Sequence, residues 1–442
     1  ERLTLKAGEQ FSFNYLQSLG HGGPQVLSGR VLLGPGESAQ VSERSGVQAS
    51  VNLDALDLDA WSALTPAPAP GQTARRSPWE PDRVDLRVAS LTFMRRTLHD
   101  VVAHAFADGS GWRASIAARE MEGSIAYRAA DAALPQGQVQ ARLSRLSLPK
   151  AQEAQVDSLL DDGPGELPAL DVQVQDFELR GKHLGQLTLQ AANRTSSDGL
   201  REWRLTHLDL AMPEASFSSS GNWALLGRAG QDAQRRTALK FELKVRDSGA
   251  LLERLGMPGV LRRGSGQLSG QVGWLGSPMS PDYPSMTGQM RLDMASGQFL
   301  KADPGLSKLL GVLSLQALPR RLTLDFRDVF SSGFSFAFVR GDVKISNGIA
   351  STSNLQMKGV NAAVLMEGQA DIAHETQDLR VVVVPELNTL SASLVAAAIN
   401  PLVGLGSFLA QFVLGDTLVK AATREFRIDG TWSDPQVRQV PA

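Results

Sequence analysis

The chain has 442 residues, with 44 basic and 46 acidic side chains, a formal net charge of −2 and no cysteine. A charge balance this even provides no basic field for nucleic acid. The lack of cysteine excludes disulfides, thiolate metal sites and cysteine nucleophiles. Hydrophobic residues at 42% and charged residues at 20% exclude global disorder. The length allows about two to four compact domains or one elongated one.

The first distinctive element is a strand followed by a short helix in the text LDALDLDAWSAL (53–64). Asp54, Asp57 and Asp59 lack the Gly and the closing Glu of a calcium loop, so we expect surface carboxylates around the start of a helix. The segment 65–82, TPAPAPGQTARRSPWEPD, is Pro-rich and predicts a linker or exposed loop.

Alternation with a period of two dominates the rest of the chain. In KFELKVR, the residues Phe241, Leu243 and Val245 fall on one face and charged residues on the other. Strict alternation predicts strands with one apolar and one polar face, and hence an antiparallel sheet. The same pattern recurs at 186–191, 321–327, 333–345, 378–384 and 426–432. Within 333–345, Phe334, Phe336 and Phe338 are predicted on one side, and Val343 and Ile345 follow after a Gly turn.

Two stretches predict helices near the C-terminal end. In the first, near 304–317, Asp303 is an expected N-cap and Pro304 stands at the first helical position. The second, 390–415, lies in an uncharged run that Asn400-Pro401 divides into halves shorter than the roughly 20 residues of a membrane span. Its second half has an apolar stripe formed by Leu402, Leu405, Phe408, Leu409 and Phe412.

Three interpretations of 390–415 are open. A bent helical pair could cap the end of a groove or enter a membrane interface, and a helix buried against the sheet fits equally well. A transmembrane span is the least favoured of the three, because the Asn-Pro step interrupts it.

A weak internal repeat aligns 97–127 with 183–223, each with strands around a Gly-containing turn and a Trp, Trp112 or Trp203. Such a repeat favours stacked modules over one closed core. We expect modules at 1–64, 83–165, 166–287 and 288–442, with 65–82 as the linker.

Catalytic signatures are missing from the sequence. It has no G-x-S-x-G, G-x-x-x-x-G-K-[ST] or H-E-x-x-H motif, and His99 and His104 make a poor metal pair. We therefore predict no enzyme activity, no catalytic residue, no metal and no cofactor.

The apolar face of each strand needs cover, since each large side chain gains about 1.5–3 kcal/mol on leaving water. A second sheet would give a β-sandwich, whereas a long curved sheet would leave a groove for acyl chains. Alternation alone does not distinguish the β-sandwich from the groove. On this pattern alone, the sandwich is the favoured interpretation.

The C-terminal half carries a resemblance to a known family. Residues 288–372, ETQDLRVVVVPELN (375–388) and EFRIDGTWSDPQV (425–437) closely resemble the C-terminal portion of the AsmA-like envelope proteins, in their YhdP branch. The resemblance extends over nearly the whole chain, strongly after about residue 165 and loosely before it. These segments are structural, so they identify the family better than any single site residue.

The resemblance implies a mostly β fold, a long, curved, taco-like antiparallel groove of repeating modules with a few short amphipathic helices. It implies passive phospholipid transport between the inner and outer membranes of a Gram-negative envelope, which supports outer-membrane lipid homeostasis and the permeability barrier. The implied location is the periplasm, anchored to the inner membrane through an N-terminal segment that this chain lacks. We therefore expect a fragment of a longer protein, with phospholipids as partners and a membrane interface possible at the C-terminal end.

Two other functions are open. A non-conducting periplasmic scaffold or outer-membrane assembly factor with a closed β core is the main alternative, and a hydrolase has no residue in its favour. Ordinary core packing is likewise the alternative for each residue predicted to line the groove. Those residues are Leu187, Leu189, Phe241, Leu243, Val245, Leu324, Phe326, Phe334, Phe336, Phe338, Val343 and Ile345.

Overall fold

The structure is a computed structural model, and its residues divide into two compact units, Glu1–Trp203 and Arg204–Ala442. The predicted module boundaries stay predictions. The structure describes residues 1–20, 23–35, 45–64, 77–93, 96–131, 134–149, 167–195, 201–226, 234–300, 334–360, 362–385 and 423–440.

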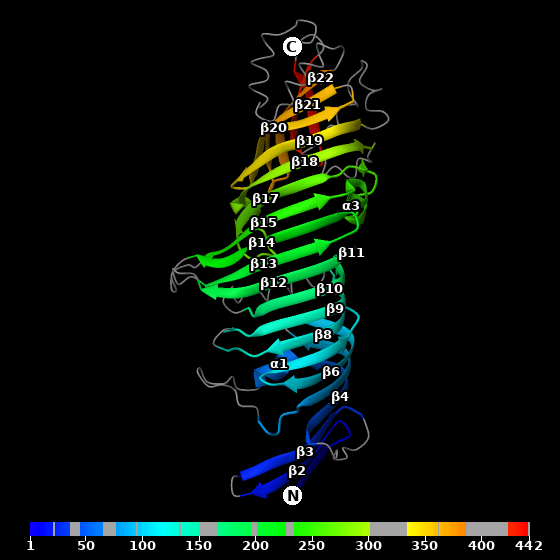
Figure 1. Ribbon diagram of the computed structural model, residues 1–442, viewed down its shortest axis with the longest axis vertical. Helices are drawn as coiled ribbons and strands as arrows, with labels where there is room; N and C mark the ends of the chain where they lie inside the picture. Colours follow the sequence, from blue (N-terminus) through cyan, green and yellow to red (C-terminus); the bar gives the residue numbers. More distant parts are fainter. Residues whose placement is uncertain are drawn as a thin grey trace. The chain divides into compact units, whose positions relative to one another are not determined.

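Across the described residues the fold is mostly β, as predicted, with a single mixed sheet of 24 strands (Figure 1). In the first unit each strand pairs with the next one along the chain, apart from the short β11, which pairs back onto β10. Its strands are β1 (Arg2–Ala7), β2 (Phe11–Gly20), β3 (Gly23–Leu33), β4 (Gly46–Asp57), β5 (Arg83–Phe93), β6 (Arg96–Asp108), β7 (Gly111–Ala117), β8 (Met121–Arg128), β9 (Gln138–Leu148), β10 (Ala169–Leu179), β11 (Lys182–His183) and β12 (Gln186–Thr195).

The sheet is not purely antiparallel, which corrects the prediction. Among the described pairs, β3–β4, β4–β5 and β9–β10 are parallel. Alternation reports that a strand has one apolar face, but it carries no information on the direction of the neighbouring strand. Parallel neighbours need a long return connection, and the Pro-rich segment 65–82 belongs to one of them, between β4 and β5.

The predicted strand-then-helix text near residue 58 is confirmed. Helix α1 (Leu58–Leu64) follows β4 directly, and the backbone N–H of Ala60 donates to the Asp57 carboxylate over 2.9 Å. A carboxylate that accepts from a free N–H in the first turn caps a helix. Asp57 is therefore a capping residue, as expected of the carboxylates at this helix start.

The second unit is an antiparallel meander in its described pairs from β14 to β24. Strand β13 (Arg201–Ala211) contains the boundary between the units. The elements that follow are β14 (Ala215–Leu226), β15 (Gln234–Val245), α3 (Ser248–Arg254), β16 (Leu261–Arg262), β17 (Gly266–Leu275), η2 (Tyr283–Ser285), β18 (Thr287–Phe299), β19 (Phe334–Ser346), β20 (Ile349–Gly359), β21 (Ala362–Asp371), β22 (Thr376–Pro385), β23 (Arg424–Thr431) and β24 (Pro435–Val440).

Both helices predicted near the C-terminal end, 304–317 and 390–415, lie outside the described residues. Of the helices in the described part of the chain, none has the length and apolar character needed to cross a membrane.

Candidate functional site

The second unit gathers its apolar side chains on one face of the sheet, which we call the apolar face. Directly opposed residues of an antiparallel pair point to the same side. Leu243 lies opposite both Phe217 and Leu268, and Leu268 lies opposite Leu292. This register carries one apolar row across β14, β15, β17 and β18.

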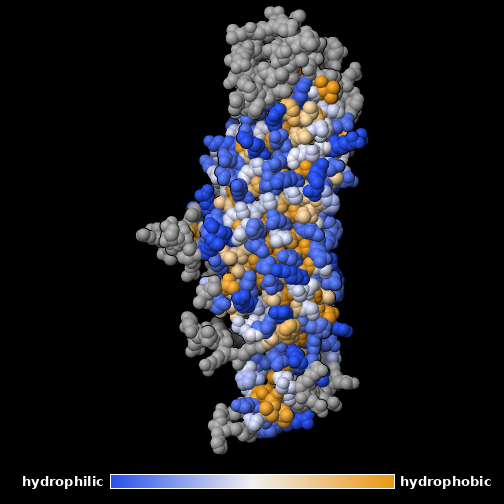
Figure 2. Space-filling view, viewed as in Figure 1, coloured by the Kyte–Doolittle hydropathy of each residue, from blue (hydrophilic) through white to orange (hydrophobic). Residues whose placement is uncertain are grey.

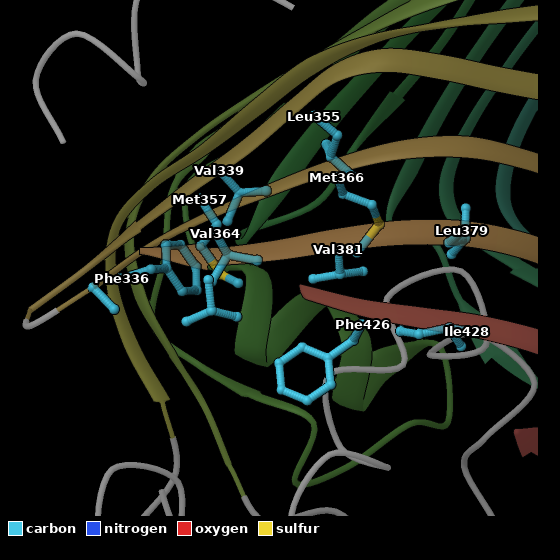
Figure 3. Close-up of a cluster of buried hydrophobic side chains, with 12 residues drawn as sticks. Phe336, Val339, Leu355, Met357, Val364, Met366, Leu379, Val381, Phe426 and Ile428 are labelled. Carbon is cyan, nitrogen blue, oxygen red and sulfur yellow. The ribbon is translucent and has the colours of Figure 1, made fainter. Parts of the chain in front are cut away.

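The apolar face continues over β19 to β23 as a closely packed cluster. Val364 lies opposite Met357 and Val383, and Val381 lies opposite Phe426. Figure 3 shows these side chains on the same side of successive strands, under an arch of the ribbon. The cluster consists of Phe336, Val339, Leu355, Met357, Ala362, Val364, Met366, Leu379, Val381, Val383, Phe426 and Ile428, each 8% exposed or less.

The opposite, polar face carries ion pairs that cross from strand to strand. Arg380 of β22 lies 3.4 Å from Glu367 of β21 and 2.7 Å from Glu425 of β23. Arg427 is 2.8 Å from Asp378 in the same sheet region. The charged side chains of these pairs are partly exposed, whereas Leu365, Val382 and Val384 on the same side of the sheet are buried.

Two other cross-strand pairs lower the pKa of the acid that they contain. The Arg291 guanidinium, with help from Asn354, holds the pKa of Asp342 below its usual range. In the first unit, Arg142 lowers the pKa of Asp171 in the same way. The carboxylates are therefore ionised at neutral pH and stabilise the cross-strand register.

Phe336 and Phe338 do not share a face, contrary to the predicted alternation. Phe336 is 4% exposed in the cluster, whereas the guanidinium of Arg340 lies 3.8 Å from the centre of the Phe338 ring. Phe338 lies opposite Lys358, on the polar face. The physical reason is a β-bulge between Phe336 and Phe338, because an extra residue reverses the side on which later side chains point.

The predicted Gly turn inside 333–345 is also wrong, since β19 runs unbroken through Gly341. A Cβ atom on Gly341 would lie 2.7 Å from the Cα of Leu355 on β20. The glycine therefore permits a close approach of two strands and does not end one.

Most of the other predicted residues that are described lie on apolar faces. Phe241, Leu243 and Val245 share the face with Val343 and Ile345 through the register of β15, β17, β18 and β19. In the first unit, Leu187 lies opposite Val174 and Leu189 opposite Val172. Phe334 belongs to β19, whereas Leu324, Phe326 and the stripe Leu402, Leu405, Phe408, Leu409 and Phe412 lie outside the described residues.

The first unit has a second apolar cluster and an aromatic row. The cluster of Val51, Val88, Leu91, Val101 and Ala103 is packed against further partly buried side chains. Figure 2 shows hydrophobic surface in view over β2 and β3, where Leu16 and Leu27 are exposed. The rings of Phe11, Phe13, Tyr15 and Trp79 form a chain of edge-to-face contacts.

The sequence reasoning missed the residues of β20 to β22. Val381, Val382, Val383 and Val384 are all buried, because both faces of this strand are covered. The alternation predicted for 378–384 therefore does not extend through Val381–Val384, because a strand buried on both sides has apolar residues at successive positions. The register with the neighbouring strands shows that Val381 and Val383 lie on the apolar face, whereas Val382 and Val384 lie on the opposite face.

The described residues offer no metal-binding cluster of three or more acidic or histidine side chains. His99 and His104 instead each contact a different carboxylate at 2.6 Å, Glu120 and Asp85 respectively.

Comparisons with known proteins identify the family of the chain. The family model described as YhdP protein matches residues 1–437. A relative from Escherichia coli strain K12, the intermembrane phospholipid transporter YhdP, is 27% identical over 261 residues. That match covers 59% of this chain and 20% of the relative, so the chain spans about a fifth of that protein. No solved structure matches significantly. With a family match over almost its entire length, the chain belongs to the YhdP protein family.

Proposed function

We propose that this chain carries phospholipids along its apolar face, as a section of a passive route between the inner and outer membranes. The single observation behind the proposal is the two-sided sheet, with an apolar row across β14, β15, β17 and β18 and charged pairs on the other side. The relative's name supports the choice of cargo, because that protein is an intermembrane phospholipid transporter.

The physical role of such a face is to replace water around the acyl chains. Each methylene that leaves water contributes about 0.8 kcal/mol, so a chain held on the sheet crosses an aqueous space at little cost. Phe241, Leu243 and Leu268 are partly exposed and can therefore contact an acyl chain. The lipid headgroup stays at the wet edge of the face. No bond is made or broken, so we propose no catalytic residue and no cofactor.

The wider setting of the proposal follows the family. Passive transport in the periplasm would supply the outer membrane with phospholipid and maintain its permeability barrier. The proposal includes anchoring of the protein in the inner membrane.

One observation favours the alternative of a non-conducting scaffold with a closed β core. The cluster on β19 to β23 is almost fully buried, with Val381 and Ile428 at 0% exposure. A site packed this tightly leaves no surface for an acyl chain. The proposal therefore assigns lipid contact to β14–β18.

Site-specific photocross-linking tests the proposal on the full chain. A benzophenone amino acid replaces Phe241 on the apolar face or Phe338 on the polar face, and the protein is illuminated with phosphatidylethanolamine in mixed micelles. We expect a lipid adduct at position 241 and little at position 338. Equal adducts at both positions, or none at 241, would overturn the proposal.

A further inference from the structure

A hollow on the polar face of the first unit combines arginine side chains with apolar ones. It is a cavity of about 420 Å³ over β3, β4, β5 and β6. Its polar wall includes Arg30, Arg87, His104 and Asp85, and Leu32 and Val102 form part of its apolar wall. The volume lies within the range of small-ligand sites, about 300–1,000 Å³.

Two arginines in this hollow make no direct hydrogen bond or salt bridge among the described residues, although the charge of Arg30 acts on Asp85 and helps to lower its pKa. The Nε atom of Arg30 is buried without a partner, and neither Arg30 nor Arg87 is in a salt bridge. Arg113 and Arg142, by contrast, each contact an aspartate, at 2.6 Å and 2.7 Å. Among the described residues, the Nε atom of Arg30 is therefore a donor without an acceptor, and the exposed Arg87 lines the same hollow.

The acid in the hollow is already engaged. Asp85 contacts the His104 ring at 2.6 Å and accepts from the Gln48 amide at 2.7 Å. The His104 hydrogen bond lowers the pKa of Asp85, so this acid is ionised at neutral pH. One carboxylate against two guanidiniums leaves the hollow with a positive balance.

We propose that this hollow is a binding site for a phosphate group, with Arg30 and Arg87 as its charged donors. Guanidinium is the preferred partner of phosphate because its N–H groups form a planar fork that matches two oxygens. The apolar wall formed by Leu32 and Val102 strengthens the attraction by keeping water from one side. The phosphate belongs either to a soluble compound or to a lipid headgroup, and the site does not depend on the proposed transport function.

Titration of the full chain with inorganic phosphate and with glycerol 1-phosphate, followed by calorimetry, tests the proposal. A parallel arm measures binding to vesicles of phosphatidylglycerol. We expect saturable binding in at least one arm and a loss of about tenfold or more in the double variant Arg30→Gln/Arg87→Gln, because hydrogen bonds to charged groups are removed. Binding in the soluble arms identifies a free phosphate, and binding to vesicles alone identifies a headgroup.

Two further variants separate a site from general effects of charge or folding. Arg113→Gln removes one cation from the polar face outside the hollow and should leave binding within about twofold. Asp85→Asn removes the competing negative charge while keeping the shape, and should tighten binding severalfold, a gain that an unfolded variant cannot produce. The proposal is overturned by no binding in any arm, by unchanged binding in the double variant, or by weaker binding in Asp85→Asn.

Discussion

The apolar face of the second unit has two parts that alternate in the same way and end in different environments. Across β14, β15, β17 and β18, the side chains of Phe241, Leu243 and Leu268 are partly exposed. Across β19 to β23, Val381, Ile428 and their neighbours are 0–8% exposed. The strands β21 and β22 are also buried on the face opposite the apolar face, where Leu365 and Val382 are buried. This burial increases the contrast with β14–β18.

The same alternating pattern of apolar residues can therefore form either a buried core or an accessible apolar surface. Residues buried on both sides of β21 and β22 stabilise the unit in the manner of a protein core. On β14–β18, Phe241, Leu243 and Leu268 keep accessible apolar surface, whereas Trp223, Val245 and Trp274 on the same face are buried. We therefore interpret β19–β23 as the folding core of the second unit and keep β14–β18 as the proposed surface for lipid.

The largest effect is expected from a charge in the closed part. Val381→Asp places a carboxylate at a position with 0% exposure, and we expect a loss of about 4 kcal/mol or more in the free energy of unfolding. Urea denaturation followed by circular dichroism measures the loss. A change below about 1 kcal/mol would show that this cluster is not a core.

A paired truncation compares a ring on the apolar face of β23 with a ring on the polar face of β19. Phe426→Ala removes a 4% exposed ring from the cluster, with an expected cost of about 3–5 kcal/mol. Phe338→Ala removes a ring that contacts Arg340 on the polar face, with an expected cost of about 1 kcal/mol. Equal losses in urea denaturation would contradict the face assignment given by the bulge.

A charge introduced on β15, where the apolar face is partly exposed, should reduce lipid contact much more than it reduces the stability of the fold. Phe241→Asp changes a partly exposed position, so we expect a cost of about 1–3 kcal/mol in the free energy of unfolding. Lipid cross-linking from a benzophenone amino acid at position 268 should nevertheless fall severalfold, because a charge repels acyl chains. Unchanged cross-linking in a folded variant would exclude β15 from the lipid path.

The smallest change in the free energy of unfolding is expected when the pH protonates Asp342, which pairs with Arg291 on the polar face. Arg291 and Asn354 lower the pKa of Asp342 in the folded chain. The stabilisation is therefore complete above the unfolded value of about 3.9 and is lost as pH falls further, through the folded pKa. Asp342→Asn should cost below about 1 kcal/mol at pH 7, and the difference from the native sequence should vanish on acidification below about pH 4. Denaturation midpoints of both proteins across that pH range measure it, and a difference that grows in acid would contradict the account.

The sequence predicted those parts of the fold in which alternation is strict. Phe241, Leu243 and Val245 were assigned to one face of a strand, and the register confirms that they share it. The parallel pairs were not predictable, because strand direction depends on the return connection and leaves no trace in the period. The face of Phe338 was not predictable either, since a bulge depends on the partner strand.

The hollow with Arg30 and Arg87 shows the same limit for sites. Each arginine is an ordinary polar residue of an alternating strand in the text, and the two are distant in sequence. The parallel pairing of β3 with β4 and of β4 with β5 brings them to one cavity. Neither a motif nor a spacing could have identified this pair.

The central claim is that the open part of the apolar face holds lipid, and native mass spectrometry of the purified chain tests it most directly. The chain is extracted in a gentle detergent, and its bound phospholipid is counted for the native sequence, Phe241→Asp and Phe338→Asp. The account predicts co-purified phospholipid with the native sequence and with Phe338→Asp, and a clear loss with Phe241→Asp. A stable, folded chain without phospholipid, or an equal loss in both variants, would contradict it.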